Sequence, residues 1–216
     1  MIFFMKKIHD DFLKPPQQQL NNLIKYYQAG QYVDAEKLSL SITQEFPKHQ
    51  FAWKVLAVLL NRNGRISESL IVSKKSVQLD PQDAEAHNNL GVLLQEQGKL
   101  YEAEKSHRKA IELKPDYAEA HNNLGNTLKQ QDKLDGAEKC YKKVITLKPD
   151  YAKAHNNLGI LLKEQGRIKE AEASYAQAIK LKPDYAEAHY NLGVLLQEEE
   201  RLDEAKTSYN HALALK

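Results

Sequence analysis

The sequence contains only one cysteine, Cys140, among its 216 residues. A single thiol allows no disulfide within the chain, and it excludes a metal site built from several cysteine ligands. The chain also lacks any apolar run close to the ~20 residues that a membrane-spanning helix needs. The opening Met-Ile-Phe-Phe-Met is too short for a signal-peptide core, and basic residues follow it instead of preceding it. These absences predict a cytoplasmic protein without a membrane segment.

An excess of charge of one sign is missing as well. Lysine and arginine number 31 and the acidic residues 29, which gives a formal net charge of +2. No basic cluster interrupts the sequence, so the electrostatic footprint of a nucleic-acid-binding protein is missing. We therefore expect neither a nucleic-acid partner nor a membrane partner, and we interpret the interspersed charges as a solvated outer face.

Recognisable catalytic motifs are missing too. The sequence has no glycine-rich phosphate loop, no Gly-x-Ser-x-Gly elbow and no His-Glu-x-x-His. Carboxylates are plentiful, but they recur at regular intervals, which is typical of a solvated face and of helix caps. We predict that the chain is not an enzyme by itself and that it binds no cofactor or metal.

What the sequence does contain is a repeat of 34 residues. The text of residues 118–151 recurs with few changes in 84–117 and 152–185, and a further copy runs from 186 to the last residue, Lys216. The same interval separates five prolines: Pro47, Pro81, Pro115, Pro149 and Pro183. Such self-similarity indicates a repeat architecture in which each unit contacts only its neighbours. We divide the chain into a tail or short capping helix (1–15), a degenerate first repeat (16–49), and repeats at 50–83, 84–117, 118–151, 152–185 and 186–216.

Each block contains the pattern of two amphipathic helices. Apolar residues recur at steps of three or four in both halves, so each half has one apolar face. Gly98 and Gly166 stand between the halves, where the end of a helix needs a left-handed residue. Asp116 and Asp184 are expected to cap the helices that follow them. The pattern predicts an all-α solenoid of six tandem helix-turn-helix units.

Position by position, the block resembles the tetratricopeptide repeat. One copy carries the small and large residues of that family at Leu124, Gly125, Leu128, Ala137, Tyr141, Val144 and Pro149. The resemblance extends from Pro16 to Lys216, and it implies a right-handed α-solenoid whose first helices line a concave, protein-binding groove. One departure is regular, because histidine replaces the family's frequent tryptophan at His87, His121, His155 and His189. Only Trp53 keeps the family's residue.

These histidines do not predict a metal site, although they are in register. Packed helices stand about 8–10 Å apart, whereas zinc needs nitrogen ligands at about 2.0–2.1 Å. Equivalent histidines of successive repeats are therefore too far apart to share an ion. We expect them to occupy the family's aromatic packing slot. His107 stands where Tyr141 and Tyr175 stand in later copies, and it is expected to pack in the same way.

Asparagines recur in the first helices, where they are mediocre helix formers. One set, the ladder asparagines, comprises Asn89, Asn123, Asn157 and Asn191; the preceding asparagines are Asn88, Asn122 and Asn156. A side-chain amide donates and accepts hydrogen bonds, which matches the polar groups of a peptide unit. Both sets are candidate peptide contacts. The alternative is that they bond neighbouring repeats to one another and stiffen the array.

The ladder is similar to the repeat arm of the O-linked N-acetylglucosamine transferase family and its bacterial relatives. This resemblance implies that Asn89, Asn123, Asn157 and Asn191 hold the backbone of a protein substrate while a separate C-terminal domain transfers the sugar. The second repeat has Val55 at the corresponding position, so the ladder is expected to be interrupted there. Under this alternative function, the chain is the substrate-recognition arm of a glycosyltransferase whose catalytic domain lies elsewhere.

Repeat domains that grip the acidic tails of heat-shock chaperones offer a second comparison. They clamp a carboxylate with lysine, asparagine and arginine at fixed groove positions. Only Lys54 and Asn126 match those positions in this chain, and they are far apart in the array. A two-carboxylate clamp is therefore not expected.

The function predicted from the sequence is a protein-interaction scaffold that binds extended protein or peptide segments in its groove. Further residues predicted to contact the peptide are Asn126, Gln95, Lys129, Lys163 and Gln197. The sixth repeat ends at Leu213-Ala214-Leu215-Lys216 without the polar capping helix that solenoids normally carry. We expect either that further residues follow in the native protein or that this open apolar side meets a partner or a second copy of the chain.

Overall fold

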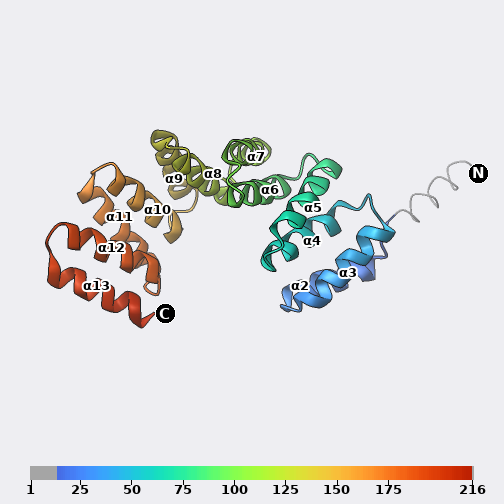
Figure 1. Cartoon of the computed structure of the whole chain (residues 1–216), viewed down its shortest axis with the longest axis horizontal. Coiled ribbons are helices and arrows are strands. Elements are labelled where there is room, and N and C mark those ends of the chain that lie inside the picture. Colours follow the sequence, from blue (N-terminus) through green and yellow to red (C-terminus); the bar gives the residue numbers. More distant parts are fainter. Residues whose placement is uncertain (1–13, 216) are drawn as a thin grey trace, which may run out of the picture. The chain divides into compact units, whose positions relative to one another are not determined.

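The computed structural model describes residues 14–215, so the predicted N-terminal tail lies almost entirely outside the described residues. Within 14–215 the chain forms twelve helices and no strands (Figure 1). Their bounds are α2 Gln17–Gln28, α3 Tyr32–Glu45, α4 Gln50–Arg62, α5 Ile66–Leu79, α6 Ala84–Glu96, α7 Leu100–Leu113, α8 Ala118–Gln130, α9 Leu134–Leu147, α10 Ala152–Glu164, α11 Ile168–Leu181, α12 Ala186–Glu198 and α13 Leu202–Ala214. Each predicted block contains one consecutive pair, which confirms the helix-turn-helix reading.

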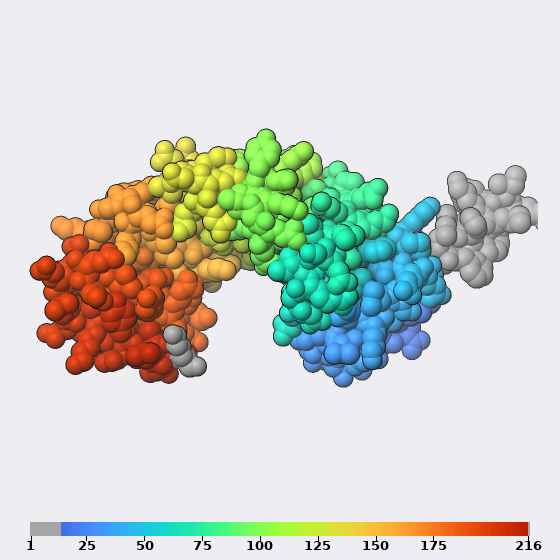
Figure 2. Space-filling model, viewed as in Figure 1, coloured from blue at the N-terminus to red at the C-terminus, as the bar shows by residue number. Residues whose placement is uncertain are grey.

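The chain divides at Lys114 and Pro115 into two compact units. The first unit holds α2 to α7 and the second holds α8 to α13, so each contains three repeats. Inside each unit the first helices of neighbouring repeats touch: α4 contacts α6, and α10 contacts both α8 and α12. The space-filling view shows side chains closing the spaces between the successive ribbons of each unit (Figure 2). Among residues 14–215, no helix has both the length and the apolar character that crossing a membrane requires.

The turn inside each repeat depends on one residue with a left-handed backbone. Gly98 and Gly166 have φ of 71° and 72°, as the sequence predicted. In two copies the glycine is replaced, and Asp132 and Glu200 adopt φ of 60° and 61°. Because a side chain disfavours this conformation, the turn geometry is imposed there by the packing of the two helices it joins.

A small residue on the first helix faces a large one on the second helix in four of the repeats. A Cβ atom placed on Gly125 would lie 2.6 Å from the ring of Tyr141, which is completely buried. The same close approach joins Gly91 to His107, Gly159 to Tyr175 and Gly193 to Tyr209. Such a distance leaves no room for a methyl group, so these glycines are required by packing and not by backbone conformation.

Histidine replaces tryptophan without losing the hydrogen bond that tryptophan makes. The indole Nε1–H of Trp53 donates to the carbonyl of Pro47 at 2.9 Å. The Nε2 atom of His121 lies 3.0 Å from the carbonyl of Pro115, and since a carbonyl only accepts, the ring nitrogen carries the proton. Equivalent bonds run from His87, His155 and His189 to Pro81, Pro149 and Pro183. The histidines thus tie the start of each first helix to the preceding turn.

The predicted caps are wrong in two repeats. Tyr117 directly precedes α8 and Tyr185 directly precedes α12, and neither makes a side-chain cap. Asp116 and Asp184 lie one residue farther from the helix, in the turn after the proline. Asp83, which directly precedes α6, does accept a hydrogen bond from a backbone N–H of that helix. A cap needs the acceptor at the flanking position itself.

Ion pairs join successive repeats along the second helices. The guanidinium of Arg167 lies 2.8 Å from Glu138, and that of Arg201 lies 2.8 Å from Glu172. Arg65 pairs with Glu36 in the first unit. Each arginine also bonds a glutamate three residues later in its own helix. These pairs are partly exposed, so they add orientation between repeats more than they add stability.

Candidate functional site

Two ladder asparagines of the second unit, Asn157 and Asn191, hydrogen-bond the preceding repeat. Asn157 donates from Nδ2 to Oδ1 of Asn122 at 3.0 Å and to Oδ1 of Asn126 at 3.1 Å. Asn191 donates from Nδ2 to Oδ1 of Asn156 at 3.0 Å. The inter-repeat bonding that the sequence left open as an alternative is therefore present for Asn157 and Asn191, and it uses the donor end of both amides.

The direction of these bonds is fixed by a carboxylate at one end. Asn156 points its own Nδ2 at Glu187 Oε1, 3.4 Å away, and a carboxylate can only accept. Its Oδ1 is therefore the atom that meets Asn191, which must donate from Nδ2. Asn191 therefore presents Oδ1 as the end of the amide that bonds no described residue. Asn157, which donates from Nδ2 to Asn122 and Asn126, presents Oδ1 in the same way. A ligand reaching these two rungs finds hydrogen-bond acceptors.

The preceding asparagines lie in the interior, which corrects their assignment as direct peptide contacts. Asn88, Asn122 and Asn156 are 5%, 1% and 0% exposed. Asn122 and Asn156 accept from the ladder asparagine of the next repeat. Because a buried amide must be satisfied inside the protein, these bonds satisfy Asn122 and Asn156 and orient Asn157 and Asn191.

In the second repeat Val55 stands at the ladder position, and its neighbour Lys54 belongs to a charged cluster. Lys54 Nζ lies 3.0 Å from Asp83 Oδ2 and 2.8 Å from Glu85 Oε2, and Gln50 also donates to Asp83. Burial opposes the charge of Lys54, but its hydrogen bonds to the two carboxylates outweigh burial and raise its pKa. An ammonium already paired in this way is not available to clamp a ligand carboxylate.

One consequence concerns Asn89, the ladder asparagine of the third repeat. The residues of the second repeat that correspond to Asn122 and Asn126 are Lys54 and Val58. Lys54 is a donor and Val58 is apolar, so neither offers the acceptor that Asn157 finds. The side-chain amide of Asn89 makes no hydrogen bond with any residue from 14 to 215, and Asn89 is half-buried.

The predicted residues at the edge of the surface are already engaged. Lys129 and Lys163 pair with Glu164 and Glu198 of the following repeat at 2.9 and 2.7 Å. Gln197 accepts a hydrogen bond from the hydroxyl of Tyr209. Gln95 and Asn123 also have partners, and both are half-buried. The lysine pairs are solvent-exposed and weak, so a ligand carboxylate can compete for either lysine.

A cavity of about 130 Å³ lies between α4, α5 and α6 in the first unit. Its lining is Ala57, Val58, Asn61, Ser73, Asn89, Val92 and Leu93. Of these, only Asn89 was predicted as a site residue. The sequence does contain a feature that could have indicated this cavity. Ala57 and Ser73 are both small, whereas the equivalent positions two repeats later hold Gly125 and the large Tyr141.

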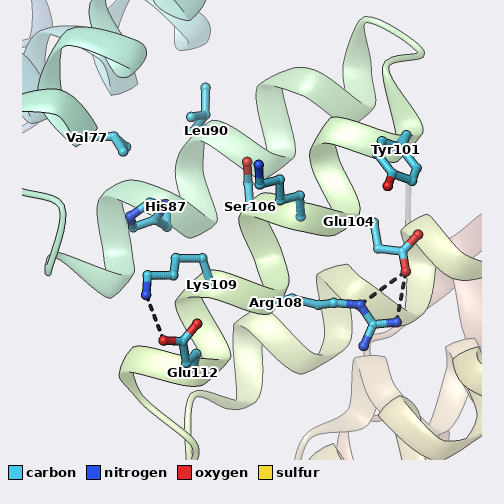
Figure 3. Close-up of a pocket in the computed structure, with 10 residues that line it drawn as sticks. Val77, His87, Leu90, Tyr101, Glu104, Ser106, Arg108, Lys109 and Glu112 are labelled. Atoms are coloured by element: carbon cyan, nitrogen blue, oxygen red, sulfur yellow. Dashed lines mark hydrogen bonds and ion pairs between the residues drawn. The ribbon is translucent and has the colours of Figure 1, made fainter.

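A larger cavity of about 620 Å³ runs along α7 (Figure 3). Four of its charged side chains form two pairs, since Arg108 lies 2.8 Å from Glu104 and Lys109 lies 2.8 Å from Glu112. The close-up shows both pairs as separate bonded couples on the same helix. These four charged groups already satisfy one another, which makes them less available to a polar ligand.

The pair α12–α13 carries an apolar hollow of about 520 Å³. Tyr190 and Tyr209 form one wall with their rings 5.8 Å apart, and Leu213 forms part of another. Tyr190 is 54% exposed and Leu213 is 67% exposed. Tyr190 also replaces the asparagine found at Asn122 and Asn156, so this repeat does not offer the acceptor that continues the ladder.

Comparison with known proteins gives one family. The description "TPR repeat" matches residues 93–132, 125–166 and 161–199, and the description "Tetratricopeptide repeat" matches 73–105 and 186–216. Together these matches cover residues 73–216 without a break. No curated protein matches the chain in sequence.

Several solved structures share the fold. The crystal structure of MamA is 25% identical, with a TM-score of 0.64 over 74% of this chain and 94% of that one. YrrB, described as a TPR protein with an unusual peptide-binding site, is 21% identical, with a TM-score of 0.62 over 82% of this chain and 92% of that one. The hetero-tetramer Cut9–Hcn1 of APC/C gives a TM-score of 0.81 at 17% identity, over 92% of this chain and 39% of that one.

Proposed function

This chain belongs to the tetratricopeptide repeat family, and we propose on that premise that it is a scaffold that binds extended segments of partner proteins along its first helices. The observation that carries the proposal is the orientation of Asn157 and Asn191. Both amides are held by the preceding repeat through Nδ2, which leaves Oδ1 for a ligand. Two fixed acceptors on neighbouring helices suit the N–H groups of a peptide backbone.

Backbone recognition of this kind is tolerant of sequence, because every residue except proline carries the same N–H group. An extended peptide advances about 3.3 Å per residue, so rungs on successive helices meet backbone groups a few residues apart. Each contact contributes only about 0.5–1.5 kcal/mol after exchange with water. Useful affinity therefore requires several rungs together, and selectivity requires side-chain pockets.

Two of the structural relatives support a binding role by analogy. YrrB is described by its peptide-binding site, and Cut9 is found in a hetero-tetramer with Hcn1. The resemblance to the arm of O-linked N-acetylglucosamine transferases predicts the same backbone contacts with catalysis outside this chain. That alternative remains a prediction, because the orientation of Asn157 and Asn191 serves an arm and a free scaffold equally well.

The test uses a displayed library of random twelve-residue peptides. Wild-type protein should enrich peptides that the double variant Asn157→Ala, Asn191→Ala fails to retain. Asn210→Ala, an exposed asparagine on α13, is the matched control and should behave as wild type. Circular dichroism then shows whether the double variant keeps its helices.

A second measurement keeps the proposal testable if the double variant unfolds. Each N–H of one enriched peptide is replaced in turn by N-methyl, which removes the donor without altering the protein. If Oδ1 of Asn157 and Asn191 accepts from the backbone, methylation at two positions should weaken binding about tenfold each. Uniform, small effects along the whole peptide would refute recognition of the backbone by these rungs.

A further inference from the structure

We propose that the cavity between α4, α5 and α6 is a specificity pocket that takes one uncharged side chain with an apolar stem and an amide or hydroxyl tip. A bound segment would place a glutamine, asparagine or threonine there. This inference rests on the proposed function, since it names the side-chain selectivity that a backbone ladder cannot supply. All of the lining belongs to the first unit.

The cavity exists because this repeat lacks the large residue that fills the same space elsewhere. In later repeats a glycine accommodates a histidine or tyrosine, as Gly125 does for Tyr141. In the first repeat the large residue is on the other helix, where Leu23 faces Ser39 and both are completely buried. Only the second repeat has two small residues, Ala57 and Ser73. Protein interiors are otherwise close-packed, so this space is a local exception.

Ser73 supplies the first sign that the space receives a ligand. Its side chain is only 3% exposed, and its Oγ has no hydrogen-bond partner among the described residues. The neighbouring serines of α5 are satisfied: Ser69 Oγ donates to the carbonyl of Ala57 at 2.6 Å, and Ser76 Oγ accepts from Gln50 at 3.0 Å. A buried hydroxyl without a partner is uncommon and requires an explanation.

Asn89 supplies the second sign. The equivalent asparagines Asn157 and Asn191 are tied to the preceding repeat, whereas Asn89 has no acceptor there. Asn61 also lines the cavity, and its side-chain amide makes no hydrogen bond within residues 14–215. The pocket therefore combines one hydroxyl and two amides with apolar walls from Ala57, Val58, Val92 and Leu93.

The lining selects against charge and against bulk. It contains no ionised group, so a charged side chain would be desolvated there without a counter-charge. A dry protein cavity of about 150 Å³ is known to hold benzene, so a volume of about 130 Å³ fits a side chain somewhat smaller than that ring. A purely aliphatic side chain would fit but would leave the Ser73 hydroxyl unsatisfied. An amide or hydroxyl tip satisfies both requirements.

The first experiment tests the pocket without any peptide. The probe is butyramide, which mimics the side chain of glutamine, and the control probe is butyrate, which has the same size but is charged. Nuclear magnetic resonance follows the methyl groups of Val58, Val92 and Leu93 during each titration. Butyramide should cause saturable shifts, and butyrate should bind at least about tenfold more weakly because its charge is buried unpaired.

Three variants show whether the cavity itself is responsible. Ala57→Gly combined with Ser73→Tyr recreates the pair found at Gly125 and Tyr141, fills the space and should abolish the butyramide shifts. Ala57→Leu fills the same space from the other helix, as Leu23 does, and covers the case in which the first variant misfolds. Ser73→Ala keeps the space but removes the hydroxyl, and it should weaken butyramide several-fold. Equal shifts in wild type and in both filled variants would overturn the proposal.

The second experiment separates this inference from the proposed function. Peptides enriched by the wild type should share glutamine, asparagine or threonine at one position. Peptides enriched by the Ala57→Gly, Ser73→Tyr variant should lose that preference while still binding. If the preference is unchanged in this variant, the pocket is refuted and the scaffold stands. If the wild type enriches no peptide, the proposed function fails, and the butyramide titration alone decides whether the cavity takes an amide.

Discussion

Replacing His107 by tyrosine should make the stability of the first unit less sensitive to acid. The imidazole is 0% exposed, with Nδ1 3.1 Å from Oδ1 of Asn88 and Nε2 buried without a partner. Since an amide oxygen only accepts, Nδ1 carries the proton of the neutral ring, and a second proton on Nε2 would be a buried, unpaired charge. Burial accordingly lowers the pKa of His107 from its ordinary 6.5 to about 4.

The sign and size of the effect follow from the two pKa values. Between 6.5 and about 4 the unfolded chain binds a proton at His107 that the folded chain does not. Stability is therefore unaffected above pH 6.5 and decreases as the pH falls through this window. At 1.36 kcal/mol per unit, acidification from about pH 7.5 to about pH 5 should remove about 2 kcal/mol from the free energy of unfolding.

Tyr175 occupies the position equivalent to His107 in the fifth repeat, and it is buried there. The first helix of both repeats also carries an apolar residue at the same position, Val92 in the third repeat and Ile160 in the fifth. The variant loses the bond to Asn88, but that cost does not vary with pH. Other groups also titrate in this range: burial together with Lys14 lowers the pKa of His49, for example. They are the same in both proteins, so they cancel in the difference.

Urea unfolding followed by the fluorescence of Trp53 suits this comparison, because Trp53 is the single tryptophan and lies in α4 of the first unit. The wild type should lose about 2 kcal/mol more than His107→Tyr over the same pH range. Parallel pH dependence of the two proteins would show that the folded state accommodates a charged His107, and the reasoning from burial would then be wrong.

The sequence was sufficient for the repeat, the helix pairs and the turn glycines, because each is decided by local chemistry at a fixed period. Gly98 illustrates this, since the end of one helix and the start of the next leave only a left-handed residue between them. The histidine found at the positions equivalent to Trp53 was predicted to fill an aromatic packing slot. Its hydrogen bond to a proline carbonyl was not foreseen, because it joins residues on either side of a turn.

The candidate site could be predicted only in part from the sequence, because it depends on the direction in which side chains point and on the residues that face them. Asn156 and Asn157 look alike in the sequence, but neighbours on a helix are rotated by about 100°. Asn156 is completely buried, whereas Asn157 is half-buried and donates to Asn122 of the preceding repeat. The pocket depends on Ala57 and Ser73 being small together, and only the packed pair of helices shows that nothing else fills the space.

Two further predictions concern the packing of helix pairs and the association of the chain with a second copy. Gly125→Ala would bring a Cβ to 2.6 Å from the ring of Tyr141 and should destabilise the second unit by about 1–3 kcal/mol. Gly136→Ala is the control: its Cβ meets only the flexible end of Leu128 at 3.1 Å, so the variant should be neutral or gain up to ~1 kcal/mol of stability from helix propensity. Equal melting temperatures for the Gly125→Ala and Gly136→Ala variants would refute the packing argument. Leu213→Lys tests self-association through the apolar hollow of α12–α13. Because burying a leucine contributes about 1.5–3 kcal/mol, the change should weaken association at least about tenfold in sedimentation equilibrium. A wild type that stays monomeric at the highest concentration reached, or a variant that associates equally well, means that this surface does not bind a second copy.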